Sequence, residues 1–205
     1  MKFTKYTLVP LLFTGFMVGF IPVAANAQAF DGPSVGIEAG WLHNTVRNPT
    51  TDAGKVPLDG SRDAAMVGIN LGYDKTFNHL VVGAETDINF GSKDAVHQTG
   101  SGYDYRIDPR RSFDATVRAG YLVTPQTLVY ARGGYTNDRI RTTISDTSTL
   151  TVVSQNRGGW LVGGGVERAI MPHLSARIEY RYADLSHGDG KYDRHQILTG
   201  LNWRF

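Results

Sequence analysis

Apolar and polar side chains alternate one by one through eight stretches of this chain. In one stretch the apolar residues Val82, Ile88 and Phe90 have even numbers, and the acidic residues Glu85 and Asp87 have odd numbers. Successive side chains of a strand point to opposite faces, whereas apolar positions of a helix recur every three or four residues. The pattern therefore predicts strands with one apolar and one polar face. They span residues 34–42, 63–74, 80–91, 112–123, 128–136, 159–169, 174–183 and 194–205.

The connections between these stretches alternate in length. Short connections on one side and long loops on the other are typical of outer-membrane barrels, and each stretch is near the roughly 9–11 residues of a tilted membrane strand. The prediction is an all-β fold, an eight-stranded antiparallel up-and-down transmembrane β-barrel with both termini in the periplasm. The short connections are 75–79, 124–127 and 171–173, and the long ones are 43–62, 92–111, 137–157 and 184–193.

A soluble antiparallel barrel of the lipocalin type is the main structural alternative, because alternation alone does not say which face is inside. Such a barrel would bury the apolar face and expose the charges. Three features favour the membrane form. One is the export signal described below. Aromatic residues such as Trp41, Tyr121 and Trp203 also lie near strand ends, where a membrane interface places them. In addition, the lysines that follow the first segment all fall outside the predicted strands. These are Lys55, Lys75, Lys93 and Lys191.

The first segment has the pattern of an export signal. Lys2 and Lys5 precede an apolar run over residues 6–25, and Ala25-Asn26-Ala27 matches a cleavage site. The run approaches the length of a membrane-spanning helix, but prolines and glycines interrupt it and no basic stop-transfer cluster follows. The predicted division is a cleaved signal peptide, residues 1–27, followed by one outer-membrane barrel domain, residues 28–205.

Charge and cysteine content narrow the function classes. Without Lys2 and Lys5 the 21 basic residues fall to 19 and balance the 19 acidic ones, so no basic excess points to nucleic acid. The chain has no cysteine, which excludes disulfides, thiolate metal sites and cysteine nucleophiles. We therefore expect no nucleic-acid partner and no metal.

Three stretches in the last third resemble a known family. Arg177-Ile178-Glu179-Tyr180-Arg181-Tyr182-Ala183-Asp184-Leu185 is similar to its recurring seventh strand, and Gly200-Leu201-Asn202-Trp203-Arg204-Phe205 to its closing strand. Residues 159–167 resemble its glycine-rich sixth strand. The chain thus resembles the small outer-membrane protein β-barrel family, which includes alphaproteobacterial surface antigens and opacity-type proteins of the OmpA-like eight-stranded type.

The resemblance implies a location and a set of roles. It implies the cell outer membrane and a terminal aromatic, Phe205, that is part of the signal read by the barrel-assembly machinery. Some relatives are described as haemin-binding, some as porin-like, and many have no assigned activity. The expected partners are outer-membrane lipid, the assembly machinery during insertion, and a host or environmental ligand at the long loops, for a protein that is expected to be a monomer.

The polar faces of the predicted strands carry many charges of both signs. In a narrow barrel they predict either an interior ion-pair network or a gated ion path, and the network is favoured because buried charges persist when they are paired. We expect Glu85 and Arg118, and likewise Arg132 and Glu167, to lie on neighbouring strands. The ten candidates are Glu38, Glu85, Asp87, Asp114, Arg118, Arg132, Glu167, Arg177, Glu179 and Arg181.

Two weaker site patterns lie in or beside the predicted long loops. Histidine and tyrosine can ligate haem iron, and they make a haemin site conceivable, although their spacing is not diagnostic. Asp184, Ser186, His187 and Asp189 contain the residue types of a hydrolase, but a serine directly beside a histidine is poorly placed for proton transfer, and the stretch reads as a turn-rich loop. The haem candidates are His43, His97, Tyr103, Tyr105, His187 and Tyr192.

The sequence thus predicts a non-enzymatic surface barrel with no catalytic residues and no obligatory cofactor. Its expected role is structural, in membrane integrity, and surface-interactive through its loops. A haemin-binding surface receptor, with haemin as the cofactor, and a narrow low-conductance porin are the alternatives.

Overall fold

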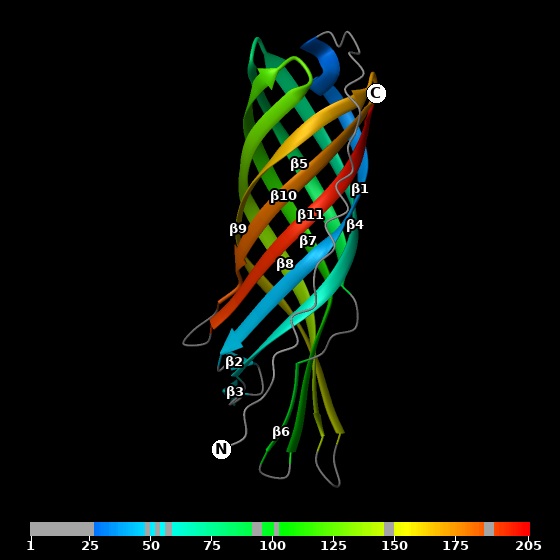
Figure 1. The fold of residues 1–205 in the computed structure, drawn as a ribbon. Coiled ribbons are helices and arrows are strands. Elements are labelled where there is room, and N and C mark those ends of the chain that lie inside the picture. Colours follow the sequence, from blue (N-terminus) through cyan, green and yellow to red (C-terminus); the bar gives the residue numbers. More distant parts are fainter. Residues whose placement is uncertain are drawn as a thin grey trace, which may run out of the picture.

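Eight long antiparallel strands wrap into a closed barrel in the computed structural model (Figure 1). The structure describes residues 27–47, 50–51, 54–55, 59–91, 96–100, 103–145, 150–186 and 191–205. No helix among them is long and apolar enough to cross a membrane. The barrel strands are β1 (Gly32–Arg47), β4 (Asp59–Phe77), β5 (Leu80–Gly91), β7 (Tyr103–Thr124), β8 (Thr127–Ser145), β9 (Leu150–Met171), β10 (Leu174–Asp184) and β11 (Lys191–Arg204).

Each barrel strand pairs antiparallel with its neighbours, and the first strand pairs with the last. β1 and β11 form a ladder from the Ser34–Arg204 pair to the Arg47–Lys191 pair. At the end that holds the C-terminus (Figure 1), the turns are short, and the turn between β4 and β5 places Asn78 at φ 56°, in the left-handed region that asparagine tolerates. The predicted strand order and up-and-down topology are confirmed.

The predicted division between outer and inner faces is also confirmed. Ile37 and Ile178 on the apolar parity expose 61% and 67% of their surface, while Glu38 and Glu179 on the polar parity expose 3% and 1%. In soluble proteins such a pattern would place apolar side chains in water, so the apolar exterior requires lipid around it. The lipocalin-type alternative is therefore wrong.

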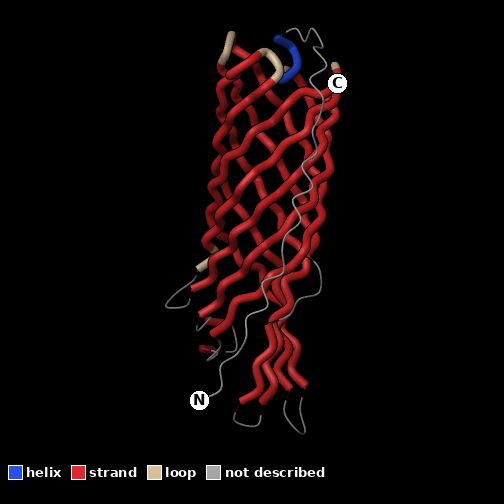
Figure 2. The backbone as a smooth tube through the Cα atoms, viewed as in Figure 1, coloured by secondary structure: helices blue, strands red, loops and turns tan. Residues whose placement is uncertain are grey.

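The predicted strand ends at the long-loop side are wrong. Residues assigned to two of the long connections, 92–111 and 137–157, continue the ladders of β7, β8 and β9, and these strands project past the rest of the wall (Figure 2). A strand outside the lipid needs no apolar parity, so alternation stops before backbone pairing does. The shorter strands at this side are β2 (Thr50–Thr51), β3 (Gly54–Lys55) and β6 (Val96–Gly100).

The prediction that these lysines all lie outside the strands is also wrong. Lys55 lies in β3, Lys75 in β4 and Lys191 in β11, whereas Lys93 lies outside the described residues. Lys75 and Lys191 are more than half exposed at the strand ends and pair with nearby carboxylates. They occupy strand positions without entering the apolar belt.

The short-turn end is closed by a segment for which the sequence carried no pattern. A single 3-10 turn, η1 (Ala27–Phe30), turns the fully buried ring of Phe30 against Val81, Leu122, Leu128 and Tyr130. The Thr76 hydroxyl donates to the Phe30 carbonyl at 3.0 Å. These contacts form an apolar plug inside the barrel mouth.

A second apolar cluster lies in the lumen toward the opposite end. It contains Leu42, Ala64, Met66 and Leu198, each buried. The inward position of Leu198 is the one apolar break in the predicted polar face of the last strand. Apolar side chains thus occupy two parts of the lumen.

The plug predicts a stability effect. Replacing Phe30 by Ala removes a fully buried ring and should lower the free energy of unfolding by about 3 kcal/mol. Urea unfolding in detergent micelles, followed by the fluorescence of the three tryptophans, measures this difference. Phe30→Leu, which keeps most of the apolar volume, should lose much less; equal stability of Phe30→Ala and the wild type would show that the plug is not part of the folded core.

Candidate functional site

The lumen holds all ten charged residues that the alternation placed on the polar face. None of them exposes more than 4% of its surface. They come from six strands, β1, β5, β7, β8, β9 and β10, so the network joins most of the circumference.

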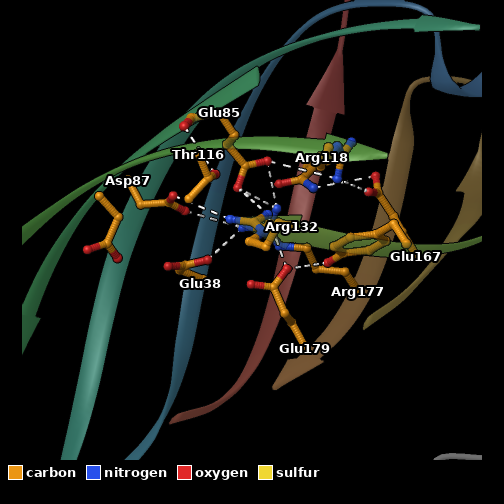
Figure 3. Close-up of polar contacts among 12 residues, drawn as sticks. Glu38, Glu85, Asp87, Thr116, Arg118, Arg132, Glu167, Arg177 and Glu179 are labelled. Atoms are coloured by element: carbon orange, nitrogen blue, oxygen red, sulfur yellow. Dashed lines mark hydrogen bonds and ion pairs between the residues drawn. The ribbon is translucent and has the colours of Figure 1, made fainter. Parts of the chain in front are cut away.

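Arg177 bridges carboxylates of two other strands in this network (Figure 3). Its Nη1 donates to both carboxylate oxygens of Glu85 at 2.8 Å, and its Nη2 donates to Glu38 Oε2 at 2.6 Å. Charge-assisted bonds of this kind are the strong ones in a protein interior. One guanidinium on β10 therefore ties β5 and β1 across the lumen.

Arg181, two inward positions further along β10 and beyond Glu179, ties the same strands at another level. It donates to Glu38 at 3.0 Å and to Asp87 at 3.1 Å, and its Nη1 lies 3.6 Å from Asp114. Asp87 and Asp114 are direct cross-strand partners. Because like charges opposite each other destabilise a sheet, the guanidinium between them is required at this level.

Arg132 and Tyr130 complete the central layer. Arg132 lies 2.8 Å from Glu85 and 3.1 Å from Glu179, and the Tyr130 hydroxyl donates to Glu179. The Tyr130 ring also lies under the guanidinium groups of Arg118 and Arg132, with 5.1 and 5.8 Å to its centroid. Tyr130 therefore joins the apolar plug to the charged layer.

Glycine leaves the space that the long side chains occupy. Gly163 is the cross-strand partner of both Arg132 and Arg181. A Cβ at Gly163 would lie 2.7 Å from the Tyr180 carbonyl oxygen, 3.2 Å from Arg181 Cγ and 3.4 Å from Arg132 Cγ. The glycine run of β9 therefore makes room for interior side chains, and no helix follows it as a phosphate-binding loop requires.

A second layer lies nearer the plug. Arg118 donates to both oxygens of Asp74 and, at 2.8 Å, to Glu167. Arg204 reaches Asp74 at 2.7 Å, and the Ser175 hydroxyl donates to Glu167 at 2.5 Å. The shortest ion pair of Glu167 is therefore the one with Arg118.

The two expected neighbour relations hold, because β5 pairs with β7 and β8 pairs with β9. The ion pairs do not simply follow these neighbours. Glu85 and Arg118 lie 4.0 Å apart, at the limit of an ion pair, and Arg132 extends toward Glu85 and Glu179.

The predicted set omits residues that the structure places in the lumen network, among them four charged side chains and one tyrosine. Each has the parity of the inward residues on its strand, and this was the available signal. Asp138 falls in a predicted loop, and Tyr130 is an aromatic residue that is not among the charged candidates. The other three lie at the ends of predicted strands, away from the middle of the barrel. The five are Asp74, Tyr130, Asp138, Arg194 and Arg204.

Arg194 and Asp138 form a third layer toward the long-loop side. Arg194 donates to Asp138 at 2.6 Å and to the Thr136 hydroxyl at 3.0 Å. Thr136 in turn donates to Asp114 at 2.5 Å, which links this layer to Arg181. The three layers thus form one connected set of charges along the lumen.

The described haem candidates do not converge. His43 is exposed on the outer wall, where it pairs with Asp63 at 2.7 Å. Tyr192 is buried, with 2% of its surface exposed. The side chains of His97, Tyr103 and Tyr105, and all of His187, lie outside the described residues. The two that are described lie on opposite sides of the wall.

The candidate hydrolase residues form a turn in their described part. The Asp184 carboxylate accepts from the Ser186 amide at 2.9 Å, and the Ser186 hydroxyl accepts from the Tyr192 amide at 3.2 Å. His187 and Asp189 lie outside the described residues. Across the residues that the structure does describe, no group of three or more His, Cys, Asp or Glu side chains could hold a metal ion.

Comparison with known proteins identifies the class. The family model for the outer membrane protein beta-barrel domain matches residues 11–205. The chain therefore belongs to this family, and the protein lies in the cell outer membrane, as predicted.

Curated relatives in the genus Brucella match over most of the chain. The 31 kDa outer-membrane immunogenic protein of Brucella melitensis is 29% identical, over 90% of this chain and 88% of the relative. The 25 kDa outer-membrane immunogenic protein of Brucella canis is 24% identical, over 97% and 94%.

Solved structures show the same fold at low identity. Neisserial surface protein A is 17% identical, with a TM-score of 0.51 over 85% of this chain and all of that protein. The Yersinia pestis attachment invasion locus protein Ail, in complex with the heparin analogue sucrose octasulfate, is 15% identical, with a TM-score of 0.50 over 84% and 99%.

The ion pairs predict that Arg118 is essential for stability. Arg118→Ala leaves Asp74 and Glu167 buried with fewer partners, and breaking a buried pair in this way costs about 3–5 kcal/mol. The temperature at which the folded band disappears on a heat-modifiable gel should fall strongly. The control is Lys75→Ala, which removes an exposed ion pair with Asp31 and should shift it little; equal shifts would contradict a structural role for the buried network.

Proposed function

We propose that this outer-membrane barrel is a non-conducting structural and surface-interaction protein. The observation that carries the proposal is the filled lumen, in which three connected layers of ion pairs and two apolar clusters occupy the interior. A water-filled path needs room that these side chains occupy. The barrel then serves as a rigid support in the membrane, and its long-loop side interacts with molecules outside the cell.

The long-loop side is the surface that meets the environment. The strands β7, β8 and β9 carry backbone ladders past the barrel wall, so they hold this surface away from the membrane (Figure 2). Binding residues are often carried by loops on a rigid scaffold. The names of the Brucella relatives call them immunogenic, which supports a role for this surface in recognition by other molecules.

Insertion by the barrel-assembly machinery is part of the same proposal. The Phe205 side chain is 73% exposed at the barrel end, and its amide donates to the Pro33 carbonyl at 3.1 Å. An aromatic side chain held at the end of the last strand and left accessible suits recognition during assembly. No enzymatic reaction is part of the proposed role.

Planar-bilayer recording tests the closed lumen. The wild-type barrel, shown to be folded by heat-modifiable mobility, should give no discrete conductance steps. Arg118→Ala should lower thermal stability more than it changes conductance, because it disrupts a structural network. A large conductance gain in Arg118→Ala with unchanged thermal stability would instead support the narrow-porin alternative.

A haemin titration on the same preparation tests the receptor alternative. The described candidates His43 and Tyr192 lie on opposite sides of the wall, so we expect no saturable shift of the Soret band. A saturable shift that is lost in His43→Ala would replace the proposed role by haemin binding.

A further inference from the structure

The lipid-facing wall contains a groove that crosses three strands. It has a volume of about 640 Å³ and lies over β4, β1 and β11, with Phe90 of β5 at one side. Its walls are apolar side chains of Ile37, Val67 and Leu201. The groove therefore faces the membrane and is separate from the charged lumen.

Small residues create this groove. Ala39 pairs directly with Thr199 on one side and with Val67 on the other. The residue before Ala39 is Glu38, which pairs with Gly200 on one side and with Gly68 on the other. These three residues also line the groove. The side chain of Glu38 bonds to arginines in the lumen, so backbone forms the floor where the bulky side chains of the belt are missing.

A polar cluster lies on the same wall, four residues further toward the long-loop side. His43 and His195 are direct cross-strand partners. Asp63 accepts from His43 at 2.7 Å and from the Trp41 indole at 3.2 Å, and the Tyr180 hydroxyl contacts His195 at 2.7 Å. Two histidines, two aromatic side chains and one carboxylate thus form the edge of the apolar belt.

Beyond this edge two cationic side chains face each other. Arg47 and Lys191 are exposed cross-strand partners, and Lys191 also pairs with Asp193 at 2.8 Å. Like charges directly opposite each other destabilise a sheet. Arg47 also lies opposite Asp59 of β4 in the register, so the phosphate of a ligand would add a further anion beside a partly balanced pair.

We propose that the groove and the cluster above it bind one phosphorylated glycolipid of the outer leaflet. One acyl chain lies in the groove over Ala39 and Thr199, and the headgroup lies against His43 and His195. The phosphate approaches Arg47 and Lys191 by charge complementarity. The Asp63 carboxylate accepts from a sugar hydroxyl, and the aromatic rings contact the sugar, so a phosphorylated sugar fits this mixed set better than a simple phosphodiester.

The depth of the groove agrees with this occupant. Ala39 and His43 are four residues apart, about 13 Å along the strand and, for a tilt of about 45°, roughly 9 Å in depth. One leaflet contributes about half of the ~30 Å hydrocarbon core. A chain whose headgroup lies at His43 therefore reaches the groove before it ends.

The selectivity comes from packing and from the headgroup. Lipid tails are as apolar as the protein wall, so burial of apolar surface gives no preference within a bilayer. A chain that fills the groove gains dispersion contacts that a flat wall does not offer. The polar side chains above the groove, among them His43 and His195, then determine which headgroup binds.

The test is native mass spectrometry of the detergent-solubilised barrel titrated with purified lipid A, dephosphorylated lipid A and phosphatidylglycerol. The wild type should retain lipid A about tenfold more tightly than either comparison lipid. Ala39→Phe, which fills the groove, should lose this preference about tenfold. Its matched control is Ala119→Phe, which adds the same ring on the outward face of β7 away from the groove and should bind like the wild type.

A second pair of variants tests the headgroup without altering the membrane belt. Arg47→Gln with Lys191→Gln should weaken lipid A binding and leave dephosphorylated lipid A unchanged. Equal binding by Ala39→Phe and Ala119→Phe, or equal retention of lipid A and phosphatidylglycerol by the wild type, would overturn the proposal. Heat-modifiable mobility confirms that each variant is folded, and the double glutamine variant keeps the test decisive if Ala39→Phe does not fold.

Discussion

Pairing of buried charge is the constraint on which the rest of this barrel depends. A guanidinium or carboxylate removed from water is stable only when partners replace its solvation. Arg177 meets this condition by bonding Glu38 and Glu85 on strands across the lumen. Each such bond fixes the distance between opposite walls, so the network that satisfies the charges also sets the shape of the lumen.

The same constraint explains features that look unrelated along the chain. A side chain at Gly163 would meet the Tyr180 backbone and the stems of Arg132 and Arg181, and the apolar clusters around Phe30 and Leu198 fill other parts of the lumen. The outer face follows the opposite requirement, since only apolar side chains suit lipid. The alternating pattern therefore meets two requirements at once, ion pairing inside the barrel and contact with lipid outside it.

The period-two pattern predicted strand number, topology and facing because lipid acts on every outward residue of the belt. It also placed Glu38, Arg118 and Arg181 inside. It could not assign their partners, because long side chains reach across the lumen to strands that are not their neighbours in the sheet. The outer parts of β7, β8 and β9 were missed because both faces leave the lipid there and the alternation is lost, and the Phe30 plug is too short to carry any period.

A double-mutant cycle on Arg177 and Glu38 tests the central claim most directly. The two side chains lie 2.6 Å apart and are almost completely buried. We predict that Arg177→Met and Glu38→Gln each destabilise the barrel, and that the double variant is less destabilised than the sum by about 2 kcal/mol, within the range of directly coupled residues. Additive single effects in urea unfolding would contradict the account, because the network would then not hold the barrel together.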